Sequence, residues 1–579
     1  MTETRLGPAL LSITLLASLG CVGSVGESQN SRDPSASGAP GGTSPPAGTP
    51  TGGSATLPGD PASGGCQEAA PLVTAARRLT REQYVNTVRD LLGDPTAALG
   101  DQLPKDDVGD SLFADPRNLL VSPDWASNAM DAAEAVAKAA AAKLQTLLPC
   151  DPATGEQACV DKFITGFGKR AYRRPLDQAE VAALGKVYAV GVKNGGFAHG
   201  VEVVVRALLQ SPSFLYRLEL GQQAGSSGSS IRLGQYEVAS RLSYLLWNTM
   251  PDQALLEAAD AGKLGSSDEI VTQARRMLAD PKAHQTLGEF HGKWLGMDGL
   301  GEVAKDPMRY PQFDAKLVAS MRTELRMLVE EVLFKGDGRL ESLFDGHFGY
   351  VDASLAPLYG VPAPAGAGFS RVELNPAQRG GVLTSVGVIA AHTLVDESEA
   401  IHRGKFIREN FLCTIPPEPP ADLMVEPPTP KPGVSTRERL AEHSVMPACK
   451  VCHQMMDPIG FGFEAYDGIG RYRTTDPSGK AVDDSGVLDM TKDANGPVTF
   501  KGPIELGKKL GGSAQVRDCL VTTVLKFAQG PDAAGDSCVQ QKLSAAFESS
   551  KHDIRELFIA VAKTEGFKYR RAIEGEVLP

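Results

Sequence analysis

Apolar residues recur at helical spacing through most of the chain after about Cys66. Thr80 stands three residues before Gln83 in the arrangement of a capping box, and Asp177 stands before Glu180 in the same way. Each box opens a run in which apolar residues return every three or four positions. The same spacing predicts further helices over 201–211, 235–247, 267–278, 314–334, 516–527 and 554–563.

Strand signals are few and short, around 348–351 and 498–500. We therefore predict a mainly α fold made of several small helical bundles in series. Breaks fall at 221–230, 361–368 and 416–433, and the last is Pro-rich and should form a stiff, extended connector. The expected helical domains cover 66–150 (N-terminal), 151–222 (second), 231–360 (central), 376–480 (carrying a C-x-x-C-H motif) and 500–575 (C-terminal).

The first residues have the character of an export signal. An apolar stretch from Pro8 to Gly20 is followed directly by Cys21, which predicts a lipoprotein-type signal peptide over 1–21 with Cys21 lipidated. An ordinary signal cleaved nearby is the alternative. Both interpretations predict export, and the first predicts a protein anchored by lipid in the cell envelope, on the periplasmic side or at the cell surface.

Residues 22–65 contain almost no apolar side chains. Gly, Ser, Pro, Thr and Ala fill 35 of these 44 positions, and only four are charged. Such a segment cannot bury enough surface to offset its ordering entropy. We expect a disordered tether between the envelope and the folded part; the alternative is a tail without a role.

The charge balance changes the range of expected partners. Lys and Arg total 58 against 70 Asp and Glu, a net charge of −12, which argues against a nucleic-acid-binding protein. No long apolar run follows the N-terminus, which excludes a polytopic membrane protein.

The most specific motif is Cys449-Lys450-Val451-Cys452-His453, the C-x-x-C-H signature of covalent haem attachment. The two thiols would add to the vinyl groups of one haem c, and His453 would be the proximal iron ligand. Three alternatives remain open: a zinc site, a thioredoxin-like redox pair, and a structural disulfide formed by Cys449 with Cys452, or by either of them with Cys413.

A distal iron ligand is less evident. Met455 and Met456 follow His453 too closely to reach the opposite haem face. His402 and His443 flank the Pro-rich connector and are the main candidates, although either can equally be an ordinary surface or hydrogen-bonded histidine. More distant candidates are Met446, His392 and Met490.

Residues after the motif could also serve a haem. Phe461 and Phe463 could cover a porphyrin face, and Arg471 or Arg473 could pair with its propionates. Simple core packing and a surface salt bridge explain the same residues equally well.

Six further cysteines are candidates for disulfides in an exported protein. Proximity suggests Cys150 with Cys159 and Cys519 with Cys538, which leaves Cys66 with Cys413. Sequence alone cannot establish this connectivity.

Five groups of longer motifs together resemble a known architecture. In chain order the groups are Arg78–Tyr84 with Asp90–Gly93; Phe167–Leu176 with Ser211–Arg217; Tyr236–Trp247 through Leu295; Arg379–Leu383 with His402–Lys405 and Cys449–Arg473; and the helices around Tyr569. The chain resembles large secreted bacterial proteins built from five consecutive domains of unknown function, numbered in the fifteen-eighty-five to fifteen-ninety-five series. The resemblance implies a mainly helical secreted protein with a cytochrome-c-like C-x-x-C-H segment. It implies no reaction. Longer relatives carry a separate cytochrome-c-like domain in front, where this chain has the tether.

Three functions follow as hypotheses. The first is a tethered c-type haem protein that transfers electrons or serves as the redox partner of an envelope oxidoreductase. The second is a disulfide-stapled binding or scaffold module without haem. The third is an enzyme that degrades envelope polymers, although neither G-x-S-x-G nor H-E-x-x-H occurs and no carboxylate pair stands out in the sequence.

Overall fold

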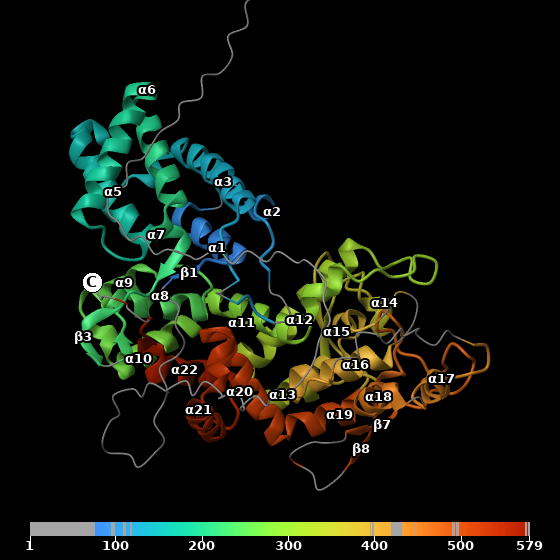
Figure 1. Cartoon of the computed structure of the whole chain (residues 1–579). Helices are drawn as coiled ribbons and strands as arrows, with labels where there is room; N and C mark the ends of the chain where they lie inside the picture. Colours follow the sequence, from blue (N-terminus) through green and yellow to red (C-terminus); the bar gives the residue numbers. More distant parts are fainter. Residues whose placement is uncertain are drawn as a thin grey trace, which may run out of the picture. The chain divides into compact units, whose positions relative to one another are not determined.

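The computed structural model describes most of the chain after the predicted tether, and all described residues belong to one compact unit (Figure 1). The described residues are 76–93, 99–107, 112–115, 118–227, 229–393, 395, 399–417, 431–445, 447–488, 493, 497–573 and 576. The predictions for the signal peptide, Cys21, the tether, Cys66, Met446, Met490 and most of the Pro-rich connector lie outside them. Within the described part, no helix combines the length and apolar content needed to cross a bilayer.

The N-terminal part is a helical bundle in which two helices, α1 and α6, begin at the predicted caps. The Thr80 hydroxyl accepts a hydrogen bond from the Gln83 amide at 3.1 Å, and the Asp177 carboxylate accepts one from the Glu180 amide at 2.7 Å. The helix from Asp177 and the one predicted from Val201 form a single element that bends at Gly196, where φ is 79°. The elements are β1 (Ala76–Arg78), α1 (Arg81–Leu92), α2 (Leu99–Gln102), α3 (Pro123–Ala141), α4 (Leu144–Leu147), α5 (Glu156–Tyr172), α6 (Gln178–Gln210), α7 (Pro212–Leu215) and β2 (Tyr216–Leu218).

The central part confirms the predicted helices closely. The helix predicted over 267–278 has those bounds, and the one predicted from Asp314 begins one residue later because Asp314 is its N-cap. The residues 221–230, predicted as a break, lie between two helical regions and include most of a hairpin, whose first strand has an irregular register between Gln222 and Ser227. The elements are β3 (Gln222–Ser227), β4 (Ser230–Arg232), α8 (Gln235–Leu246), α9 (Gln253–Asp260), α10 (Ser267–Leu278), α11 (Pro281–Trp294), α12 (Ala315–Glu330), α13 (Leu340–Asp345), β5 (Phe348–Val351), α14 (Ala356–Tyr359) and β6 (Ser370–Glu373).

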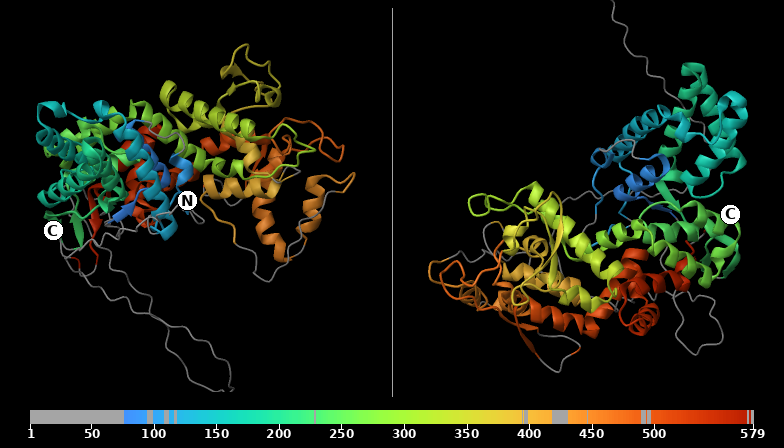
Figure 2. Two further views of the ribbon diagram at one scale, coloured as in Figure 1. Left: turned by 90° about the horizontal axis from the view of Figure 1, so that it is seen from above. Right: turned by 180° about the vertical axis from the view of Figure 1, so that it is seen from behind.

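The C-terminal helices fold back onto this central part, so that α22 lies beside α10 (Figure 2). Strand β9 pairs antiparallel with β4, and Arg241 of α8 donates to the carbonyls of Gly566 and Phe567 at 3.0 and 2.9 Å. One hydrophobic core consequently runs from Phe113 to Phe567. The central and C-terminal bundles share this core, whereas the N-terminal bundle has a core of its own. The elements are α19 (Gly502–Gly511), α20 (Ala514–Gln529), α21 (Ser537–Ser549), α22 (Ile554–Lys563), α23 (Glu565–Lys568) and β9 (Tyr569–Arg571).

A helical region that includes the C-x-x-C-H motif lies between the central and C-terminal parts along the chain. Its helices α16 and α18 pack against one another, and a short hairpin, β7 with β8, follows (Figure 1). The strands predicted at 348–351 and 498–500 are both present, as β5 and β8. The elements are α15 (Val386–Ala391), α16 (Ala400–Phe406), α17 (Thr436–His443), α18 (Pro447–Gly460), β7 (Ser485–Leu488) and β8 (Val498–Lys501).

The disulfides confirm one predicted pair and correct the others. Cys150 is bonded to Cys159, as their proximity suggested. Cys413 is bonded to Cys519, with a Cα–Cα distance of 5.4 Å, so the predicted pairs of Cys519 with Cys538 and of Cys66 with Cys413 are wrong. Cys538 is also disulfide-bonded. The prediction failed because closeness along the chain says nothing about α20 folding back beside the segment that follows α16.

Candidate functional site

The C-x-x-C-H motif lies on α18, whose helical period places its three functional side chains close together. Cys449 is buried, Cys452 is half-buried, and both are unpaired thiols. The Cys452 thiol donates a hydrogen bond to the Pro417 carbonyl at 3.3 Å. Because Cys413 is bonded to Cys519, the alternative in which Cys449 or Cys452 forms a structural disulfide does not describe this structure.

His453 is held by a carboxylate one turn further along the same helix. Its Nδ1 lies 2.9 and 3.1 Å from the two carboxylate oxygens of Asp457, and both side chains are buried. The hydrogen bond to Asp457 raises the pKa of His453 more than burial lowers it. When Nδ1 carries the proton that it donates to Asp457, the imidazole lone pair is on Nε2, the nitrogen that would bind a metal. Asp457 was not among the predicted site residues, although its i,i+4 spacing from His453 is visible in the sequence.

Helix α18 is fixed by a very close crossing with α16. A Cβ placed on Gly404 would overlap the Met456 carbonyl oxygen, and one placed on Gly460 would overlap the Ala400 carbonyl oxygen. The two backbones therefore touch at two glycines, one on each helix. Arg408, which follows α16, donates to the Met455 carbonyl at 2.6 Å and ties the middle of α18 to the same neighbour.

The residues after α18 mostly serve packing. Phe463 belongs to the main hydrophobic core, and Phe461 packs in a small cluster under the Arg437 guanidinium, 4.3 Å from its ring centroid. Arg473 is paired with Glu464 at 3.2 Å, and Arg471 is exposed. In this structure the packing interpretation accounts for both aromatic rings.

Five family models match the chain, one after another. They are described as proteins of unknown function and cover residues 77–142 (DUF1587), 159–219 (DUF1595), 233–361 (DUF1592), 379–476 (DUF1588) and 497–567 (DUF1585). The chain is built from these five consecutive domains. No curated protein and no solved structure matches it.

The site described above lies entirely in the DUF1588 domain. The label of that family model, PSCyt3, points to cytochrome-like domains. Helices α16 and α18 both fall within its range, 379–476, so the crossing at Gly404 and Gly460 is internal to this domain.

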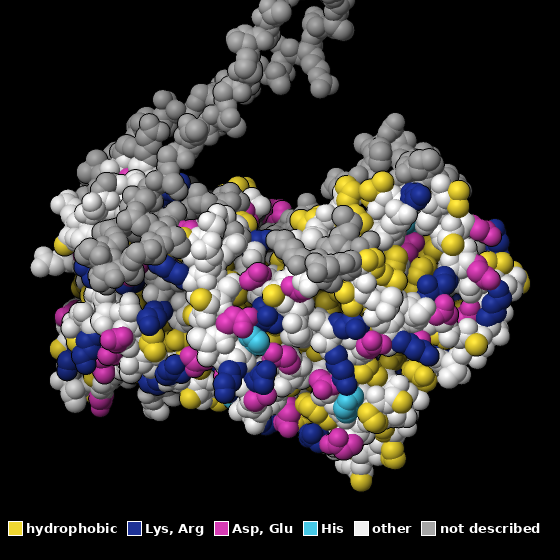
Figure 3. Space-filling view, turned by 90° about the horizontal axis from the view of Figure 1, so that it is seen from below, with side chains coloured by type: hydrophobic (Ala, Val, Ile, Leu, Met, Phe, Trp, Pro, Cys, Tyr) yellow, Lys and Arg dark blue, Asp and Glu magenta, His cyan; other side chains and the backbone are white. Residues whose placement is uncertain are grey.

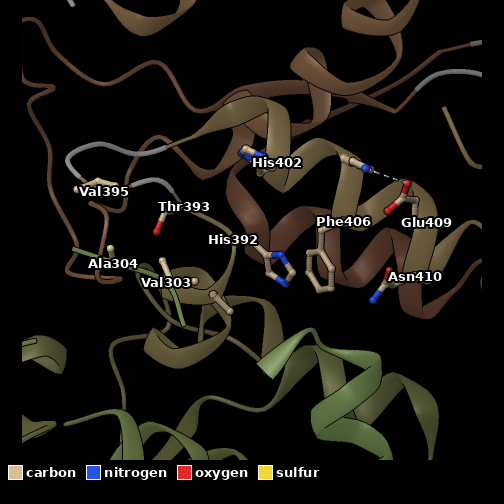
Figure 4. Close-up of a pocket in the computed structure, with 11 residues that line it drawn as sticks. Val303, Ala304, His392, Thr393, Val395, His402, Phe406, Glu409 and Asn410 are labelled. Atoms are coloured by element: carbon tan, nitrogen blue, oxygen red, sulfur yellow. Dashed lines mark ion pairs between the residues drawn. The ribbon is translucent and has the colours of Figure 1, made fainter. Parts of the chain in front are cut away.

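His402, a predicted distal ligand, lies in a cavity of about 460 Å³ that the DUF1588 domain shares with residues of the DUF1592 domain (Figure 4). Ala400 and Gly404 face α18, and at about 100° per residue His402 points away from it. His392 lines the same cavity, stacked on Phe406, and its Nε2 donates to the Leu295 carbonyl at 3.0 Å. The structure therefore does not bring His402 or His392 to His453.

The remaining candidates are only partly described. His443 is the last residue of α17, and its side chain lies outside the described part of the chain. Met456 is buried on α18 itself, against Gly404. In the described part of the chain, no group of three or more His, Cys, Asp or Glu side chains is placed to hold a metal ion.

Apolar side chains next to the motif remain exposed to solvent. Val451, between the two cysteines, is 59% exposed, Val445 just before α18 is 75% exposed, and Ile415, two residues from the Pro417 that contacts Cys452, is 80% exposed. All three lie within a few residues of the motif or of a group that contacts it, and exposed apolar side chains are candidates for a covered surface.

Proposed function

We propose that this chain is an exported, membrane-tethered c-type haem protein that holds one haem through Cys449 and Cys452, with His453 as the proximal iron ligand. One observation carries the proposal: α18 presents two unpaired thiols at C-x-x-C spacing and a histidine whose Nδ1 is held by a buried carboxylate. A bound haem would supply a one-electron redox centre.

The chain's own residues have distinct roles in this proposal. Cys449 and Cys452 provide the covalent attachment, and Asp457 orients the His453 ring so that Nε2 is the ligating atom. The crossing of α16 with α18 keeps the backbone under these side chains in place. Ile415, Val445 and Val451 would exclude water from the edge of the haem.

The proposed cellular role is electron transfer, or service as the redox partner of an envelope oxidoreductase. The predicted signal peptide and the tether over 22–65 support a location at the envelope, where Cys21 would carry the lipid. The DUF1588 label supports a cytochrome-like domain. A redox partner protein is the expected interaction.

Expression of the full chain with a c-type maturation system tests the haem. We expect a pyridine haemochrome spectrum and a covalent adduct that the double variant C449A/C452A lacks. The double variant C150A/C159A, which removes a disulfide from another domain, should keep the haem. A wild-type chain with no covalent haem would refute the proposal.

The same expressed protein distinguishes haem attachment from the scaffold hypothesis. Thioether-linked cysteines cannot form disulfides, so peptide mapping under non-reducing conditions reports the state of Cys449 and Cys452 directly. Recovery of a Cys449–Cys452 disulfide from the exported protein would favour a disulfide-stapled binding module without haem.

A further inference from the structure

A large cleft lies where four of the five domains meet. Its volume is about 960 Å³, and it is lined by residues of β1, α1, β2, α11, α12 and α20. Ligand sites in proteins favour cavities of this size at domain junctions. Cys449, Cys452 and His453 do not line it, so a ligand in this cleft would be separate from the proposed haem.

The lining of this cleft is predominantly cationic in an acidic protein. Nine Lys or Arg residues line it against five Asp or Glu residues, although the chain as a whole has a net charge of −12. On the outer face shown in Figure 3, the two signs of charge are interspersed. Lining carboxylates pair with only some of these cations: in the described part of the chain, Arg217, Arg322 and Lys526 have no ion-pair partner.

Two of the cations stand directly opposite one another. Arg77 of β1 and Arg217 of β2 are cross-strand partners, an arrangement that destabilises an antiparallel pair when the charges are alike. The Nε atoms of both are enclosed by protein and have no hydrogen-bond partner among the described residues. Burial and the neighbouring Arg77 lower the pKa of Arg217 to about 10. The buried carboxylate of Glu219 lies 3.8 Å from Arg77 Nε and is shared with Arg241 at 2.6 Å, so it offsets only part of this positive charge, and a bound anion would offset more of it.

A carboxyl pair faces the same cleft. The carboxyl groups of Glu82 of α1 and Glu289 of α11 lie near each other, and Gln285 donates to Glu289 at 2.8 Å. Burial and the charge of Glu82 raise the pKa of Glu289 to about 8, so the Glu289 carboxyl holds a proton near neutral pH. The pair therefore repels an anion less than its composition suggests. Arg322 shares an adjoining cavity of about 400 Å³ with the pair.

We propose that this cleft binds a small organic anion that carries carboxylate or phosphate groups at two or more positions. Arg77 and Arg217 bind one such group, because guanidinium N–H donors match the paired oxygens of carboxylates and phosphates. Arg322, next to the Glu82–Glu289 pair, binds a second group. The site goes beyond the proposed haem function and does not depend on it.

Calorimetric titration of the purified full chain tests the site, with citrate, pyrophosphate and acetate as probes at constant ionic strength. We expect citrate or pyrophosphate to bind and acetate to bind more weakly, since it offers a single anionic group. The stronger of the two multivalent probes identifies the carboxylate or the phosphate chemistry. Failure of both to bind at millimolar concentration would overturn the proposal.

Three single substitutions test whether the residues of the cleft bind the probe anion. Arg217→Gln should weaken the better probe by about tenfold or more, because a charge-assisted hydrogen bond is lost. Lys526→Gln changes an exposed residue on the cleft wall and should weaken it several-fold even if the Arg217 variant does not fold. Arg275→Gln, at an exposed arginine paired with Glu556 outside the cleft, should bind as wild type does. Unchanged affinity in the folded Arg217 and Lys526 variants would also overturn the proposal.

Discussion

The side chains that define the α18 site come from one stretch, Cys449–Asp457, whereas the cleft at the domain junction draws on residues from Arg77 to Gly530. In the first region the helical period alone brings the groups together. In the second, Glu82 of α1 and Glu289 of α11 come near each other only in the folded chain. The difference teaches that local chemistry can be read from a motif, while a cleft exists only once the domains are assembled. It also predicts that changes in the packing of the domains should disturb the cleft more than the α18 site.

The largest expected effect comes from the disulfide that joins the DUF1588 and DUF1585 domains. Cys413 and Cys519 are 106 residues apart, and removing the bond with C413A/C519A should lower the free energy of unfolding by about 4–5 kcal/mol, because the unfolded chain regains the entropy of a long loop. The local bond between Cys150 and Cys159, 9 residues apart, should contribute only about 2–3 kcal/mol. Denaturant unfolding under non-reducing conditions measures both, and equal losses would contradict the loop-length argument.

The next largest effect is expected at Gly460, where α18 crosses α16. Gly460→Ala should destabilise the protein by about 3 kcal/mol or more, because the new methyl group meets the Ala400 backbone carbonyl, which cannot move aside cheaply. Gly185→Ala is the matched control, since it is also helical and has no atom within 4 Å of the added Cβ.

That control should leave stability unchanged or raise it by about 0.5–1 kcal/mol, through better helix propensity. Thermal and denaturant unfolding provide the measurement. Similar behaviour of the two variants would show that α16 and α18 do not touch as closely as described.

The pair formed by Glu82 and Glu289 should make the free energy of unfolding depend on pH. Burial and the charge of Glu82 raise the pKa of Glu289 from 4.5 to about 8, and Gln285 and Lys293 oppose that rise only partly. The folded state therefore holds a proton that the unfolded state has released between those values, so stability should fall as pH rises, by up to about 1.4 kcal/mol per pH unit. Glu289→Gln should remove this slope. Unfolding titrations of both proteins across the interval check it, and an identical slope in the variant would contradict the pairing.

The smallest expected effect concerns His453. In the haem-loaded protein, Asp457→Asn should raise the reduction potential by tens of millivolts, because a neutral amide no longer increases electron donation from the imidazole to the iron. Potentiometric titration measures the shift. Asp476→Asn, at a turn carboxylate that bonds only local backbone and Ser478 groups, is the control and should leave the potential unchanged.

A substantial part of the fold was accessible from local sequence. The capping boxes at Thr80 and Asp177 and the helix over 267–278 are confirmed, since each depends on contacts within a few residues. The hairpin formed by β3 and β4 was missed, because its stability comes from pairing with β9 more than 330 residues later. His402 was a reasonable distal candidate by its distance along the chain, but the face of α16 that carries it depends on which side packs on α18.

From the sequence come the mainly helical class, by apolar periodicity, the C-x-x-C-H motif, by its spacing, and the series of five domains, by resemblance to a known architecture. The first two depend on periodicity and short spacings, which survive in any arrangement of the domains, whereas the helix that carries the motif, α18, was not among the predicted helices. Only the tertiary structure decided that Cys413 pairs with Cys519, that Asp457 and two glycines hold the motif in place, and that a cationic cleft forms around Glu82 and Glu289. These features depend on burial and on contacts between distant segments, whose energies appear only when the chain is packed.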